Sequence, residues 1–200
     1  MSLFNCTVAA AWVLAASSVS LAQSAPPVSV NRNSLVIADF DKRVDEYVKL
    51  RKRVQGALPA VKSKTTAANI KQYELSLAQA IRAQRSQAKA GDIFTPPVSQ
   101  LFRQLIATPL QSSQGGRVRA SLRDAEPVHG LNLAVNQPYP QDSAMQSTPP
   151  SLLLNLPRLP ADLEYRIVGR ELVLLDTATN LIVDLLPEAL PALQGESSKQ

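Results

Sequence analysis

The feature that most constrains the fold is a set of three short apolar runs near the C-terminus. They cover residues 165–168, 171–176 and 181–185, and two short turn segments separate them. This spacing predicts a three-stranded antiparallel meander, and Asn180 suits a turn position with positive φ. Because an isolated meander is only marginally stable, its apolar face must pack on other elements. We expect that face to carry Ile167, Val173, Leu175, Ile182 and Leu186.

Two segments upstream of the meander, 37–58 and about 65–90, carry apolar residues at helical spacing. The first stripe is Ile37, Phe40, Val44, Tyr47, Val54 and Leu58, and the second is Ile70, Tyr73, Leu77 and Ile81. Neither stripe can remain in water, so two such helices joined by a short linker are expected to form an antiparallel hairpin.

The helix ends are expected at residues with capping or breaking chemistry. Asp39 or Asp41 is expected to cap the first helix, because short polar side chains bond the free N–H groups of the first turn. A third helix is expected to start at Pro96, where a missing N–H costs nothing, and to stop at Pro109. Its buried face would carry Val98, Leu101, Phe102, Leu105 and Ile106.

Residues 109–160 hold eight of the chain's 15 prolines and predict a long irregular connection. A short helix is expected over 117–125. Strict alternation at Leu131, Leu133 and Val135 favours one edge strand, and Pro149 favours a brief helical turn just after it.

These elements together predict an α+β fold in a single domain over residues 36–194. Within it we expect a helical part over 36–108, the Pro-rich connection, and the meander over 161–194. Residues 23–35 are expected to be a flexible N-terminus, and residues 195–200 a frayed tail. Aromatic residues are sparse, so the core is expected to be aliphatic.

Residues 1–22 have the composition of an export signal. They contain the only cysteine and the only tryptophan and no charged side chain, and they end in Ser20-Leu21-Ala22, a small-x-small pattern. The apolar run of about sixteen residues is shorter than the roughly twenty needed to span a bilayer. We therefore expect cleavage after Ala22 and a periplasmic or secreted mature chain without cysteine and without a transmembrane span.

Positive charge is concentrated in the N-terminal half. Residues 32–90 hold 13 Lys or Arg against 5 Asp or Glu, whereas residues 151–200 hold 4 against 7. The polar face of the first helix is expected to carry a cluster that we call the basic face: Lys42, Arg43, Lys49, Arg51, Lys52 and Arg53. Such a face favours an acidic envelope protein, anionic lipid or lipopolysaccharide as partner, and export disfavours nucleic acid.

The sequence offers no recognisable reaction centre. His129 is the only histidine, and no Gly-x-Ser-x-Gly motif or phosphate-binding glycine loop occurs. One histidine and no mature cysteine cannot complete a tetrahedral zinc site. We therefore expect no catalytic, cofactor-binding or metal-binding residue.

Three stretches resemble an uncharacterised family of exported bacterial proteins. They are Gly91 to Pro96, Val135 to Pro140, and Leu163 to Arg170 followed by Leu181 to Asp184. The resemblance implies an envelope or secreted location and carries no assigned activity. The meander is also similar to terminal hairpins of small periplasmic nickel and cobalt homeostasis proteins, from which this chain departs by having a single histidine.

These observations lead to one expected function and two alternatives. The expected function is a non-enzymatic exported protein that binds an envelope partner through the basic face. The first alternative is a small hydrolase or carbohydrate-active enzyme that uses carboxylates alone, which needs two converging acids. The second is a module whose first helix lies on an anionic membrane surface.

Overall fold

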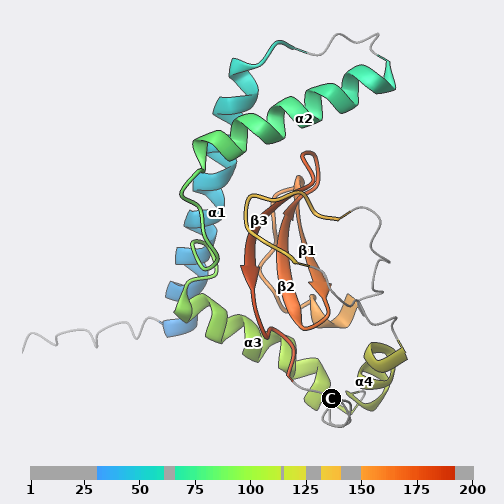
Figure 1. Ribbon diagram of the computed structural model, residues 1–200. Helices are drawn as coiled ribbons and strands as arrows, with labels where there is room; N and C mark the ends of the chain where they lie inside the picture. Colours follow the sequence, from blue (N-terminus) through green and yellow to red (C-terminus); the bar gives the residue numbers. More distant parts are fainter. Residues whose placement is uncertain (1–30, 61–65, 114, 125–131, 141–149, 192–200) are drawn as a thin grey trace, which may run out of the picture.

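The computed structural model describes residues 31–60, 66–113, 115–124, 132–140 and 150–191, and it has an α+β fold. The described elements are α1 (Arg32–Ala57), α2 (Ala67–Gln84), α3 (Pro96–Gln111), α4 (Gly115–Asp124), the 3-10 turn η1 (Pro150–Leu152), β1 (Leu163–Val168), β2 (Glu171–Asp176) and β3 (Leu181–Leu186). In Figure 1, α1 runs beside the sheet, α3 lies toward its lower end and α2 leans over its upper end. The α+β architecture and the C-terminal meander are therefore confirmed. The expected signal peptide, His129 and residues 195–200 lie outside the described residues.

Helix α1 begins earlier than its expected acidic caps. Asn31 is the N-cap, and its side chain accepts a 3.0 Å hydrogen bond from the backbone N–H of Asn33. Residues 32–35, which were expected to be part of a flexible N-terminus, are therefore helical. Since a short amide side chain caps as well as a carboxylate, Asp39 is free to pair with Arg43 one turn later, at 2.9 Å.

Helix α2 contacts α1 through its C-terminal half. Thr66 caps it with a hydrogen bond from the Asn69 N–H, and Leu77 and Ile81 are buried in the core shared with α1. The expected stripe is wrong at the helix start, where Ile70 is 46% exposed. The first half of α2 therefore extends away from α1 and over the sheet (Figure 1).

Helix α3 starts at Pro96, as its sequence predicts, but it does not stop at Pro109. Pro109 lies inside the helix, which continues to Gln111. A proline in the last turn removes one backbone hydrogen bond there, and this explains why the helix ends shortly afterwards. The short helix expected over 117–125 corresponds to α4, and the expected turn near Pro149 corresponds to η1.

The sheet has the strand order β1-β2-β3 and is antiparallel throughout. Leu174 pairs with Asp184 and Leu175 pairs with Ile182, so a β-bulge at Val183 interrupts the ladder between β2 and β3. A bulge changes the direction of the side chains beside it. Asp184 consequently points to the loop that joins α2 to α3.

Both faces of the sheet are buried, whereas the sequence predicted a single apolar face. The helix-side face carries Leu163, Ile167, Leu172, Leu174, Leu181, Val183 and Leu186. Val173, Leu175 and Ile182, which were expected to pack on the helices, lie on the opposite face with Tyr139, Leu133 and Val135. The reason is that β2 and β3 are almost continuously apolar, and alternate residues of a strand point to opposite sides.

The core is not purely aliphatic. Phe40 from α1, Phe102 from α3 and Phe94 from the loop before α3 are buried and form one ring cluster with Tyr165 of β1. The ring centroids of Phe40 and Phe102 are 4.9 Å apart. The few aromatic residues of the core therefore form one cluster where the helices meet the sheet.

Residues 136–139 cover the outer edge of β3. The N–H of Asn136 donates to the carbonyl of Ile182 at 2.8 Å, and the N–H of Tyr139 donates to the carbonyl of Asn180 at 2.8 Å. Leu131 of the expected edge strand lies outside the described residues, and 132–135 form no strand. The pairing with β3 occurs instead at 136–139 and is irregular, since Pro138 and Pro140 cannot supply ladder N–H groups.

Candidate functional site

Arg51 is not part of an exposed basic face, which corrects the expectation from sequence. It is 5% exposed. Its Nε lies 2.9 Å from Oδ2 of Asp176, and its Nη1 donates to Oδ2 of Asp162 at 2.7 Å. Asp176 also accepts a 2.7 Å hydrogen bond from the hydroxyl of Tyr47. Arg51 and Asp176 are buried and Asp162 is exposed. The cluster ties α1 to the end of β2, so its charges serve the fold.

The other residues of the expected basic face divide into two groups. Arg43 is partly exposed and bonds both Asp39 and the backbone carbonyl of Asp92. The second group is exposed on α1 and forms no ion pair with another described residue: Lys42, Lys49, Lys52 and Arg53. The basic face is therefore smaller than the sequence suggests.

Asp184 is a second buried carboxylate with a structural role. Its Oδ2 accepts hydrogen bonds of 2.7 Å from the N–H groups of Ile93 and Phe94, and its Oδ1 accepts one of 2.9 Å from Gly91. Burial raises the pKa of Asp184, while these backbone hydrogen bonds act to lower it. Both oxygens are occupied as acceptors, which leaves no free face for acid–base chemistry.

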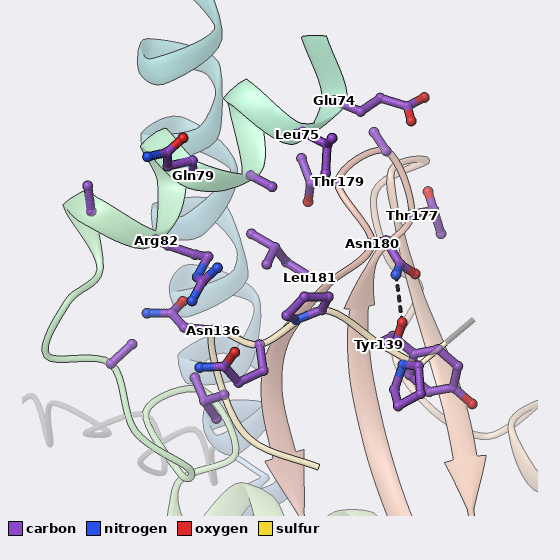
Figure 2. A pocket seen from close by; sticks show the side chains of 18 of the residues that line it. Glu74, Leu75, Gln79, Arg82, Asn136, Tyr139, Thr177, Thr179, Asn180 and Leu181 are labelled. Carbon is purple, nitrogen blue, oxygen red and sulfur yellow. Dashed lines mark hydrogen bonds between the residues drawn. The ribbon is translucent and has the colours of Figure 1, made fainter. Parts of the chain in front are cut away.

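A large hollow of the described surface is a groove between α2 and the turn that joins β2 to β3. It has a volume of about 1190 Å³ and is open to solvent. One wall is a face of α2, and the other combines residues 135–140 with residues 177–181. Figure 2 shows side chains from both walls around this space. We call it the α2 groove.

Hydrogen bonds hold the walls of the α2 groove in place. The Asn180 side chain donates to the carbonyl of Tyr139 at 2.7 Å, which joins the turn to residues 135–140 (Figure 2). At the other end, Arg85 donates to the side chain of Asn136 at 3.2 Å and to the carbonyl of Val183 at 3.0 Å. The amide of Asn136 donates back to the Arg85 carbonyl. The groove is therefore a fixed part of the fold.

Several polar groups in the α2 groove have no partner among the described residues. The guanidinium of Arg82 and the side-chain amides of Gln79 and Gln137 make no side-chain hydrogen bond within that part of the chain. Thr179, 7% exposed, has a buried hydroxyl without a partner there. Lys71 lies 3.9 Å from Glu74, a weak surface pair. These groups give the groove unused hydrogen-bonding capacity and a net positive charge.

Acidic side chains are scarce in the described lining of the α2 groove. Glu74 is the only acidic residue among its described lining, whereas carboxylate-based glycoside hydrolysis needs two carboxyl groups about 5 to 10 Å apart. Across the described residues, no group of three or more His, Cys, Asp or Glu side chains is arranged to hold a metal ion. The arrangement suits binding.

The α2 groove was not predicted from the sequence. The expected apolar stripe of α2 was Ile70, Tyr73, Leu77 and Ile81, none of which lines the groove. Within 135–140, Val135 was expected in an edge strand of the Pro-rich connection. The available signal was the pattern of exposed and small side chains at Leu75, Ala78, Gln79 and Arg82, which share one helix face. That signal identifies a face but not what lies opposite it.

Comparisons with known proteins add no assignment. No family model, curated protein or solved structure matches the chain. Among the helices that the structure describes, none has the length and apolar character needed to cross a bilayer. The function is therefore inferred from the geometry of the site.

Proposed function

We propose that the protein is a non-enzymatic exported binding protein and that it holds its partner in the α2 groove. The observation that carries this proposal is a groove of about 1190 Å³ whose polar side chains have unused hydrogen-bonding capacity. Concave sites with a few well-placed polar groups are the usual places for ligands. The buried charges outside the groove, at Arg51, Asp176 and Asp184, are already used by the fold.

A blocking substitution tests the groove. Gln79 is exposed and lines the groove, so Gln79→Trp is expected to fill it without disturbing the core. Gln72 is exposed on the same helix and outside the groove lining, so Gln72→Trp is a matched control. Using the full chain as bait against an envelope fraction, we expect Gln79→Trp to lose the captured partner and Gln72→Trp to retain it. Retention by both variants contradicts the groove as the contact.

The exposed basic residues of α1 support a second contact. Lys49, Lys52 and Arg53 lie within five residues and have no ion pair among the described residues. Changing all three to Gln is expected to weaken capture at low salt if this surface meets an acidic protein. Unchanged capture at low salt contradicts that contact and leaves the groove as the binding surface.

The membrane-surface alternative has less support. An interfacial helix needs an exposed apolar face, whereas the apolar residues of α1 mostly face the core, and Leu35 is the only one among the exposed large hydrophobic residues. Flotation with vesicles that contain 30% or so of anionic lipid, at low salt, separates lipid binding from protein binding. We expect the protein to remain with the soluble fraction.

Export itself is tested at the N-terminus of the secreted chain. A signal peptide that ends at Ala22 predicts a mature chain that begins with Gln23. N-terminal sequencing of protein from the envelope or the medium checks this. A chain that keeps Met1 or remains in the cytoplasm contradicts export.

A further inference from the structure

The length of the α2 groove fits a short stretch of polymer. Its α2 wall runs from Lys71 to Ala83, which is about 18 Å at 1.5 Å per residue. An extended chain advances about 3.3 Å per residue, so the wall faces about five or six residues of such a chain. The groove volume of about 1190 Å³ also exceeds the range of about 300–1,000 Å³ for small-molecule pockets. A linear ligand therefore fits better than a compact one.

The wall formed by residues 135–140 restricts how a peptide can be recognised. The N–H groups of Asn136 and Tyr139 already donate to β3, and Pro138 and Pro140 have no N–H. A peptide therefore cannot add a regular strand along this wall. Recognition must come from side chains of the groove.

The charge of the groove favours an acidic ligand. Arg82 lies on the groove face of α2, and its guanidinium has no ion pair or hydrogen bond with another described residue. Glu74, the one acid of the described lining, is already near Lys71. A guanidinium presents two parallel donors that match a carboxylate.

Leu75 supplies an apolar contact at a defined distance from Arg82. It is 53% exposed and lies seven residues before Arg82, so the two share one face of α2 (Figure 2). Seven residues of helix rise about 10.5 Å. In a peptide with the extended polyproline II conformation, side chains three positions apart lie on the same side of the chain and are about 9.3 Å apart. An apolar side chain and an acid three positions apart therefore match this pair.

We infer that the α2 groove binds an extended acidic peptide segment of a partner protein, with an apolar side chain on Leu75 and a carboxylate on Arg82. This inference depends on the proposed binding function and adds the class of ligand. An acidic oligosaccharide fits less well, because the ring of Tyr139 is buried and Arg166 lies over it, 4.9 Å from its centroid. The described groove thus offers no open aromatic face for a sugar.

Fluorescein-labelled peptide pools test the inference on the mature chain. Each peptide has seven residues, with Leu and Glu fixed three positions apart in either order and neutral residues elsewhere. The matched pools replace Glu with Gln or Leu with Ser, and an oligogalacturonate serves as an acidic carbohydrate. Fluorescence anisotropy measures the affinity of each probe for the wild type and for Arg82→Gln, Leu75→Ser and Gln79→Trp. Arg158→Gln is the control, since Arg158 is exposed and outside the groove lining.

The Leu/Glu pool is expected to bind more tightly than the Gln pool by about tenfold, which is the loss for one charge-assisted contact. Arg82→Gln should remove that difference, Leu75→Ser should remove the preference for Leu, and Arg158→Gln should change neither. If Gln79→Trp abolishes binding of the Gln pool and the Leu/Glu pool has no advantage over it, the groove binds peptides and the inference of an acidic ligand is wrong. If only the oligogalacturonate binds through Arg82, the inference of a peptide ligand is wrong. If no probe loses affinity in Gln79→Trp, the proposal that the α2 groove is the binding site is wrong as well.

Discussion

The hydroxyl of Tyr47 donates a 2.7 Å hydrogen bond to Asp176, a residue 129 positions later in the chain. The same Asp176 accepts the N–H groups of Ala178 and Thr179, so it also shapes the turn beside the α2 groove. A single buried carboxylate therefore connects α1 to a wall of the candidate site. Stability of the helix–sheet contact and geometry of the groove are expected to change together.

Tyr47→Phe is expected to lower the free energy of unfolding by about 1–3 kcal/mol, because Asp176 loses a donor while buried. Urea unfolding followed by circular dichroism measures the loss. Tyr73→Phe is the control, since Tyr73 is only partly buried and its hydroxyl bonds no described residue. Equal stability of Tyr47→Phe and wild type would mean that the hydrogen bond contributes nothing.

Stability is also expected to fall at alkaline pH. Burial, together with the charge of Asp176, raises the pKa of Tyr47 well above its ordinary value of 10.0, and burial does the same for Tyr165. The folded chain keeps protons that the unfolded chain releases, so the stability they contribute is complete below about pH 10 and is lost as the pH rises above it. Each tyrosine contributes a slope of up to about 1.4 kcal/mol per pH unit. Between pH 8 and 11, the free energy of unfolding should fall less steeply with pH for Tyr47→Phe than for the wild type. Equal slopes would contradict a contribution from Tyr47.

Asp184→Asn is expected to cost about 2–4 kcal/mol although the side chain keeps its shape. Both oxygens of Asp184 accept backbone N–H groups, and an amide NH₂ in either position would face a donor and leave a buried N–H unpaired. Asp45→Asn, on an exposed position of α1, should change stability by less than about 0.5 kcal/mol. Similar losses for the two variants would refute the role of Asp184.

Arg51→Met is expected to destabilise the protein by about 3–5 kcal/mol, because it leaves the buried carboxylate of Asp176 without its cation. Lys52→Gln, one residue away and exposed, should have almost no effect. Thermal unfolding of the two variants compares them directly. A harmless Arg51→Met would show that the ion pair between Arg51 and Asp176 contributes little to stability.

Part of this arrangement was predictable from sequence. Phe40, Val44 and Tyr47 follow helical spacing, and the same spacing continues to Arg51, so an arginine on the apolar stripe signalled a buried ion pair. Asp184 gave a similar signal, as a lone acid in an apolar strand. Their partners were not predictable, because Asp176 and residues 91–94 meet them only through tertiary packing.

The α2 groove could not be predicted from the sequence for a related reason. Spacing identified Leu77 and Ile81 as the buried side of α2, but it said nothing of the angle at which α2 leaves α1. That angle decides whether Leu75 and Arg82 face solvent or the turn of the sheet. Local patterns determine elements, whereas the space between elements depends on how they pack.

Substitutions at Asn180 separate two contributions to the wall of the α2 groove. Asn180 has φ of 54°, and its side chain donates to the carbonyl of Tyr139. Asn180→Gly keeps the left-handed backbone and loses the hydrogen bond, so we expect a cost of about 1 kcal/mol. Asn180→Ala also adds the strain of a Cβ at positive φ, for a total cost of about 2–3 kcal/mol. Urea unfolding gives both values, and equal costs for Gly and Ala would show that the backbone conformation of the turn does not limit the fold.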